Sequence, residues 1–197
     1  MFKKPSLAII KKVFLIGFSA FLFATEYTTL AKKSSAAPGF FEYQWDKPPG
    51  YKQLKYFQSS TDPLDRAKYY FFLRGRDRRN NIIKLTLKVP DYFDAKIKSK
   101  NLSLCKVNVG GFTSKTRCLE KVPSVIEIND NQTSIEIFPK RPIPLNKDNY
   151  AVLMKIFNPR KTGMFQIQAL SQSQLPGEMP ISTYLGTWNV QVVGRVE

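Results

Sequence analysis

The chain has 197 residues, of which 31 are lysine or arginine and 15 are aspartate or glutamate, so its formal net charge is +16. It contains no histidine, which excludes Ser-His-Asp and Cys-His catalysis and every metal site built on imidazole. A charge of this size attracts polyanions or anionic lipid head groups, but it does not indicate a fold.

Residues 1–31 are predicted to be a signal peptide. Two pairs of lysines precede an uncharged run from Val13 to Ala24, and this run of 12 residues is shorter than the roughly 20 that a transmembrane helix needs. Cleavage is expected after Ala31; the alternative is a helix that stays buried or membrane-bound. Without residues 1–31 the chain keeps 27 basic and 14 acidic residues, a net charge of +13.

Residues 32–65 are interpreted as a lead-in segment that wraps the domain. Prolines at positions 38, 48, 49 and 63 disfavour helices and central strands here. Four aromatic residues of the segment would line a ligand platform or, alternatively, cover the flank of the domain: Phe40, Phe41, Tyr43 and Trp45. The remaining residues, 66–197, are expected to form one domain.

The apolar pattern of residues 66–197 has a period of two. Apolar residues alternate with polar ones over 83–89, 165–169 and 188–192, and a hairpin is expected from Ser124 to Phe138 with its turn at 129–131. No helical spacing persists for long. Eight or nine short strands therefore predict an all-β, antiparallel β-sandwich of immunoglobulin-like or fibronectin-like type.

Cys105 and Cys118 flank a segment that contains Gly110-Gly111, as in a hairpin. A two-residue glycine turn would place Cys105 opposite Thr116, whereas a four-residue loop would place it opposite Cys118. In an exported protein this spacing favours a disulfide over two free thiols. Two thiolates without histidine do not complete a tetrahedral shell, so no metal and no cofactor are expected.

The segment "PIPLNKDNYAVLMKIFNP" places Leu145 five residues before Tyr150, after a turn-forming Asn-Lys-Asp-Asn. This arrangement resembles the tyrosine corner of immunoglobulin-like sandwiches, in which a phenol hydroxyl binds upstream backbone. Tyr150 is therefore predicted to be a structural corner residue.

Two basic segments fall between predicted strands, where binding residues collect but where charge is also easily solvated. One is "RGRDRR" at 74–79 and the other is "NPRKTG". The alternative interpretation is that these basic residues only form solvated surface, and that exposed lysines prevent sheet edges from pairing with other chains. The candidate anion-binding residues are Arg74, Arg76, Arg78, Arg79, Arg160 and Lys161.

Export makes nucleic acid an unexpected partner despite the charge. The expected partners are anionic polysaccharide, lipopolysaccharide, the membrane surface through peripheral contact, or an envelope protein. Paired carboxylates would allow glycosidase chemistry, but Glu127 and Glu136 alternate with isoleucines, as outward strand positions do. We therefore expect that the protein is not an enzyme.

From about Ile82 to Val193 the sequence resembles a secreted cyanobacterial family called domain of unknown function 2808. The resemblance rests on the strand ending in Val89-Pro90, the Pro-x-Pro-Leu corner, the strand closed by Asn158-Pro159, the Gly-Met-Phe strand and the final Tyr-Leu-Gly. It implies an exported protein of the periplasm or cell envelope with no assigned activity or catalytic residues.

The sequence thus predicts a non-enzymatic exported protein of the periplasm or outer envelope, or one released from the cell, that binds anionic envelope material. One alternative is an envelope assembly module that binds a partner protein by β-strand addition. A second alternative is a glycan-processing enzyme.

Overall fold

The structure is a computed structural model that describes residues 50–111, 113–173 and 180–194. The described residues all belong to one compact unit, Pro49–Glu197. The expected signal peptide, its cleavage site and the aromatic residues of 40–45 lie outside the described residues. Residues 50–65, expected as lead-in, belong to the same unit as the strands that follow.

The described part of the chain is all-β, with short 3-10 turns instead of α-helices, and it contains no helix long and apolar enough to cross a membrane. The strands and turns are β1 (Tyr56–Gln58), β2 (Arg66–Leu73), η2 (Gly75–Asp77), β3 (Lys84–Lys88), η3 (Ser99–Asn101), β4 (Leu102–Asn108), β5 (Arg117–Val122), β6 (Ser124–Ile128), β7 (Ser134–Pro139), β8 (Tyr150–Phe157), β9 (Gly163–Ser173) and β10 (Ile181–Val192).

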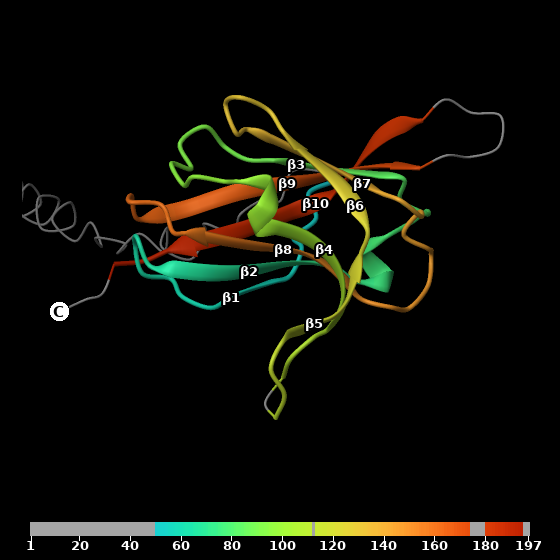
Figure 1. The fold of residues 1–197 in the computed structure, drawn as a ribbon, viewed down its shortest axis with the longest axis horizontal. Helices are drawn as coiled ribbons and strands as arrows, with labels where there is room; N and C mark the ends of the chain where they lie inside the picture. The colour runs from blue at the N-terminus through green and yellow to red at the C-terminus, as the bar shows by residue number, and fades with distance from the viewer. Residues whose placement is uncertain (1–49, 112, 174–179, 195–197) are drawn as a thin grey trace, which may run out of the picture. The chain divides into compact units, whose positions relative to one another are not determined.

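The strands form two antiparallel five-stranded sheets (Figure 1), in the orders β1-β2-β8-β4-β5 and β10-β9-β3-β7-β6. The predicted all-β antiparallel sandwich is confirmed. The described residues contain ten strands instead of eight or nine. β1 is one that the pattern could not show, because three residues in a proline-rich segment are too short for a recognisable period of two.

Strand β3 and the β6–β7 hairpin form where the alternation predicts them. Leu85 and Leu87 of β3 are fully buried, and β6 pairs with β7 from Ser124↔Pro139 to Ile128↔Ile135. The turn between β6 and β7 is stabilised by Asn129, whose Oδ1 accepts a hydrogen bond from the backbone N–H of Ser134 at 2.9 Å.

The main core lies between the sheets. In β2, Tyr69 and Phe71 point into this core with no exposed area, and the ring of Phe71 lies 5.0 Å from that of Trp188 in β10. Burying side chains of this size contributes about 1.5 to 3 kcal/mol each. A second buried cluster occupies the other face of the β2 sheet, because the intervening side chains of a strand point the opposite way. It consists of Tyr70, Phe72, Cys105, Val107, Ala151 and Leu153.

Cys105 and Cys118 form a disulfide across β4 and β5, as predicted, with their Cα atoms 5.6 Å apart. Both expected registers are wrong, because Cys105 pairs with Lys121 and Cys118 pairs with Val107. A β-bulge after Lys106 shifts the ladder by one residue, so the disulfide joins diagonal neighbours.

Segment 51–58 joins the two sheets along one edge of the sandwich. The backbone N–H of Leu54 donates to the carbonyl of Thr187 at 2.8 Å, and the N–H of Thr187 donates to the carbonyl of Lys52 at 2.8 Å. Gly186 has a φ of +148°, and a Cβ there would lie 2.6 Å from the Lys52 carbonyl oxygen. This edge therefore requires glycine at position 186.

We expect Gly186→Ala to destabilise the protein by about 1 to 3 kcal/mol, because it adds strain at a positive φ and a contact with the backbone of segment 51–58. The matched control is Gly111→Ala, since a Cβ at Gly111 has no atom within 4 Å. Urea unfolding of both variants measures the difference. Equal free energies of unfolding would contradict this account of the edge.

Candidate anion-binding surface

Two loops meet at one end of the sandwich because the strands that carry them are neighbours. Loop 74–83 follows β2, loop 140–149 precedes β8, and β2 and β8 pair up to Leu73↔Tyr150. An isolated bridge between Ile82 and Ile143 joins the loops directly. We call these two loops, with Lys52 and Lys106 beside them, the basic end; it lies at the right of Figure 1, where the short blue-green coil of η2 is drawn.

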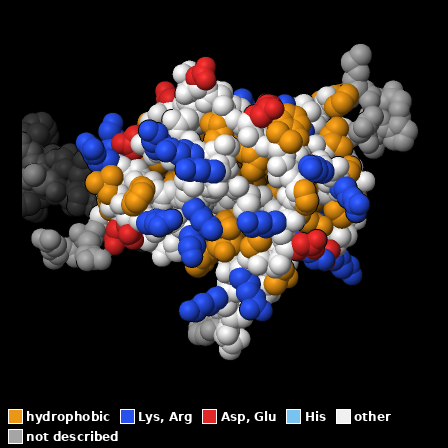
Figure 2. Space-filling model, viewed as in Figure 1, with side chains coloured by type: hydrophobic (Ala, Val, Ile, Leu, Met, Phe, Trp, Pro, Cys, Tyr) orange, Lys and Arg blue, Asp and Glu red, His pale blue; other side chains and the backbone are white. Residues whose placement is uncertain are grey.

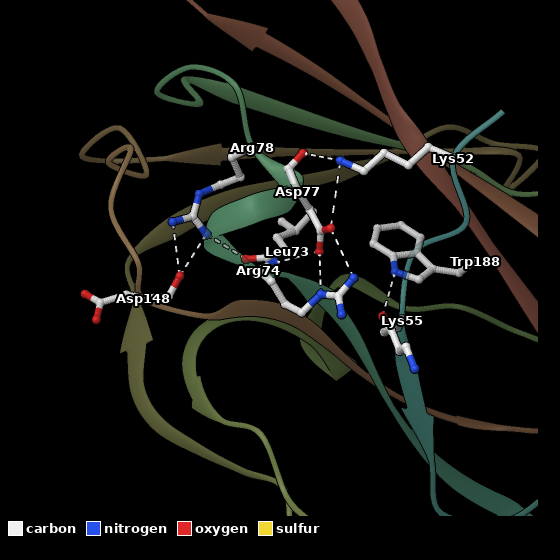
Figure 3. Close-up of polar contacts among 8 residues, drawn as sticks. All are labelled: Lys52, Lys55, Leu73, Arg74, Asp77, Arg78, Asp148 and Trp188. Carbon is white, nitrogen blue, oxygen red and sulfur yellow. Dashed lines mark hydrogen bonds and ion pairs between the residues drawn. The ribbon is translucent and has the colours of Figure 1, made fainter. Parts of the chain in front are cut away.

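Arg78 connects the two loops from inside. It belongs to loop 74–83, is only 4 % exposed, and its guanidinium binds peptide oxygens of loop 140–149 and of the last residue of β2. Nη1 donates to the carbonyls of Leu73 at 2.6 Å and Asp148 at 3.1 Å. Nη2 donates to the carbonyls of Pro144 at 3.2 Å, Asn146 at 2.9 Å and Asp148 at 3.1 Å. Figure 3 shows this guanidinium directed away from the side chain of Asp77 and toward the backbone of Asp148.

The expectation that Arg78 contacts an external anion is therefore corrected. Its terminal nitrogens are occupied by the protein's own carbonyl groups, and its side chain is shielded from solvent. Burial lowers the pKa of Arg78, while interactions with Tyr150, Asp148 and Asp77 act in the opposite direction. The residue is a structural tie.

Tyr150 lies at this corner and is 8 % exposed, but its contact differs from that of the predicted tyrosine corner. The described residues provide no hydrogen-bond partner for its hydroxyl. Instead its ring lies under the guanidinium of Arg78, with 5.0 Å between Cζ and the ring centroid, and Leu145 is 54 % exposed. Arg78 makes the backbone contacts that the phenol was expected to make.

Arg74 is also engaged within the protein. Its Nε lies 2.8 Å from Oδ2 of Asp77, a residue only 3 % exposed, and its Nη2 donates to Oδ1 at 3.1 Å. Lys52 approaches the same carboxylate at 3.8 Å. Gly75 allows the loops to approach closely, since a Cβ there would lie 2.6 Å from the carbonyl oxygen of Asn146.

Arg76 and Arg79 remain exposed, as do three further cations of the basic end: Lys140, Arg141 and Lys147. None of these five forms an ion pair with any residue that the structure describes. Figure 2 shows lysine and arginine side chains over much of the face in view, with acidic side chains in fewer places. Five cations at the basic end are thus available to a partner.

The nearby acidic residues are largely neutralised by other cations. Asp77 is paired with Arg74, and Oδ2 of Asp148 lies 2.8 Å from Nζ of Lys106. The hydrogen bond between Lys106 and Asp148 lowers the pKa of the Asp148 carboxyl group and raises the pKa of Lys106. The potential at the surface of the basic end is therefore set mainly by the five unpaired cations.

Three hollows open at the basic end. One of about 440 Å³ lies between the loops and is lined by Arg74, Gly75, Arg76, Leu145, Asn146, Lys147 and Asn149. One of about 590 Å³ is lined by Lys106, Glu120, Val122, Pro123, Lys140, Arg141, Pro142, Ile143, Pro144 and Tyr150. A third, of about 400 Å³, is bordered by Asp77 and Arg79. Each has cationic side chains in its wall.

Arg160 and Lys161 lie at the opposite end, in the loop between β8 and β9. That end of β2 and β8 begins at Arg66↔Phe157, and the eight residues of β2 span about 25 Å. The loops there also carry Asp62, Asp65, Asp91 and Asp94, and the N–H of Arg160 donates to Oδ1 of Asp94 at 3.1 Å. The six predicted residues therefore do not form one site.

The sequence analysis missed Lys52, Lys140, Arg141 and Lys147. Lys140 and Arg141 are adjacent in sequence, which is the same signal as the pair at 160–161, but their position beside the arginine loop depends on the bridge between Ile82 and Ile143. No group of three or more His, Cys, Asp or Glu residues suited to a metal occurs among the residues the structure describes.

Comparison with known proteins finds one family and several similar solved structures. The model of a family described as "Protein of unknown function (DUF2808)" matches residues 40–192. Comparison with curated proteins gives no significant match.

Among solved structures, BslA, a bacterial hydrophobin, is similar at 10 % identity and a TM-score of 0.46, with 74 % of this chain and 94 % of BslA covered. A collagen-binding domain from a Staphylococcus aureus adhesin is 10 % identical with a TM-score of 0.39, covering 69 % of this chain and 93 % of that domain. The collagen-binding subdomain of the Enterococcus faecalis surface protein ACE is 7 % identical with a TM-score of 0.42, covering 72 % and 97 %.

We expect Arg78→Met to destabilise the protein by about 3 kcal/mol or more, because an apolar side chain of similar length leaves buried carbonyl groups without donors. Arg79→Met, at an exposed neighbouring position, should change the free energy of unfolding by no more than about 0.5 kcal/mol. Urea unfolding of both variants provides the measurement. A small effect of Arg78→Met would show that the carbonyl groups find other donors, contrary to the role given to Arg78.

Proposed function

We propose that this chain, which belongs to the DUF2808 family of proteins of unknown function, is a non-enzymatic protein of the cell envelope that binds an anionic polymer through its basic end. The observation that carries the proposal is the group of five unpaired cations on two loops that Arg78 ties together. Cations on tied loops lose less conformational freedom on binding than cations on free segments.

The distribution of charge supports a directed contact with the polymer. The unpaired cations of the basic end lie beside acidic groups that are already paired, whereas the opposite end mixes arginine and lysine with four aspartates. Unpaired charges of one sign attract a polyanion over a screening length of about 8 Å at physiological salt. The polymer is therefore expected to meet the basic end first.

Two features support a location outside the cytoplasm. The first 31 residues have the layout of a signal peptide. The disulfide between Cys105 and Cys118 is of the kind that forms and persists in oxidising compartments. The polymer would then belong to the envelope, as polysaccharide, lipopolysaccharide or the membrane surface, and nucleic acid is not the expected partner.

The lining of the hollows supports a role in binding without catalysis. Hydrolysis of a glycoside typically uses two carboxyl groups about 5 to 9.5 Å apart. Among the described residues, the hollow with Lys140 contains one carboxylate, Glu120, and the hollow with Arg79 contains one, Asp77. Glu136, considered from the sequence, is paired with Lys84 at 2.8 Å on the sheet and lies in neither hollow.

The test compares two charge reversals of equal size on immobilised dextran sulfate. The double variant Arg76→Glu/Lys147→Glu should lower affinity on the order of tenfold, because it removes two contacts and adds repulsion. The control, Arg160→Glu/Lys161→Glu, changes the net charge by the same amount at the opposite end and should lower affinity less. Elution with a sodium chloride gradient measures both.

Equal losses in the two variants would mean that only the overall charge matters, contrary to the proposal. Retention that persists at high salt would also contradict it and would favour a protein partner that adds a strand to a sheet edge. Circular dichroism of each variant checks that the sandwich still forms.

A further inference from the structure

The third hollow of the basic end differs from the other two because serine and threonine side chains line it. It has a volume of about 400 Å³ and opens where β9 and β10 reach the basic end. Its wall consists of Gly50, Lys52, Asp77, Arg79, Asn80, Ser171, Ser173, Thr183, Tyr184 and Leu185. The volume lies within the range of pockets for small ligands.

The hydroxyl groups replace the apolar core at the end of the sandwich. Along β9 the inward positions Phe165, Ile167 and Ala169 are buried and apolar, and the next inward position is Ser171, which faces Leu85 of β3 across the ladder. Ser171 is also paired with Thr183 of β10, so their side chains share one face. The space between the sheets thus ends in a polar wall.

The serine and threonine hydroxyls of this wall make no hydrogen bond within the part of the chain that the structure describes. Ser171 is 8 % exposed, yet its side chain has no hydrogen-bond partner among the described residues, and the same holds for Ser173 and Thr183. Ser173 is partly exposed and Thr183 is exposed, so these groups are open to a ligand that enters the hollow. Each hydroxyl both donates and accepts, as the hydroxyls of a sugar do. A partner that supplies several hydroxyl groups would satisfy this wall.

The charged residues of the hollow favour a ligand that also carries an acidic group. The guanidinium of Arg79 is exposed and forms no ion pair with described residues, so it can bind a carboxylate through two parallel hydrogen bonds. The one carboxylate of the wall, Asp77, is already held by Arg74 at 2.8 Å. Lys52 also lines the hollow, but its Nζ donates to the carbonyl of Asp77 at 2.9 Å and lies 3.8 Å from Oδ1 of the same residue, so Arg79 is the cation left for the ligand.

We propose that this hollow binds one acidic sugar of a polysaccharide, with Arg79 on the carboxylate and the Ser171, Ser173 and Thr183 hydroxyls on the sugar ring. The inference rests on the proposed function and narrows the anionic polymer to an acidic polysaccharide. An anionic lipid such as phosphatidic acid would bind Arg79 through its phosphate but has no sugar ring to contact the row of hydroxyls.

The test is a titration of the full chain with sodium glucuronate, followed by the amide signals of Ser171, Ser173 and Thr183 in nitrogen-15 NMR spectra. Glucuronate should shift these signals in a saturable way, and glucose, which lacks the carboxylate, should shift them much less. Ser171→Ala/Thr183→Val should weaken glucuronate binding about tenfold, since it removes two hydrogen bonds. The matched control is Ser182→Ala/Thr162→Val, which removes the same groups outside the hollow.

Absent shifts, equal shifts with glucose, or equal affinities of the two double variants would overturn the inference. In a second arm, vesicles of phosphatidylcholine with phosphatidic acid, whose head group has no hydroxyls, replace glucuronate. Binding of vesicles without any effect of glucuronate would overturn the acidic sugar in favour of lipid. Retention on dextran sulfate that depends on Arg76 and Lys147 would in either case leave the proposed function standing, so the two failures can be told apart.

Discussion

The buried guanidinium of Arg78 is the interaction on which the basic end depends. A planar guanidinium presents its donors in a fixed fork, so this side chain of loop 74–83 can hold peptide oxygens of loop 140–149 and of the end of β2 at defined positions. Loops of this kind otherwise leave carbonyl groups facing the protein without partners, at a cost of about 1 to 3 kcal/mol each. The desolvation of one cation is thus offset by the satisfaction of several backbone groups, and the ring of Tyr150 covers its face.

This arrangement separates the arginines of one short segment into different roles. Arg78 faces the protein and binds backbone, and Arg74 neutralises the buried carboxylate of Asp77. Arg76 and Arg79 face solvent. The arginines that make contacts inside the protein therefore hold in place the arginines that a partner can reach. Loop 140–149 adds its lysines beside them, so the positive charge of both loops lies at one end of the strands.

The end of a sandwich is also the place where the two sheets no longer need to fill the space between them. Toward the middle, Phe71 and Trp188 close that space with apolar contacts. At the basic end the inward positions of β9 and β10 change to serine and threonine, and the tied loops border the resulting hollow. A rigid scaffold with polar groups at its loop end is a common arrangement for binding sites.

The sequence by itself determined the all-β class, the positions of β3 and the β6–β7 hairpin, and the partners in the disulfide, because alternation, turn residues and cysteine spacing act over a few neighbouring residues. It could not determine the register of the cysteines, since the bulge after Lys106 depends on how β4 meets its neighbours. Nor could the sequence show which arginines are buried and which are exposed at the same end of the sandwich. Whether Arg78 is buried depends on a carbonyl group 70 residues away, and whether Arg160 joins it depends on the direction of the strands between them. Only the tertiary structure decides such questions, because they are settled by contacts between segments that the chain order keeps far apart.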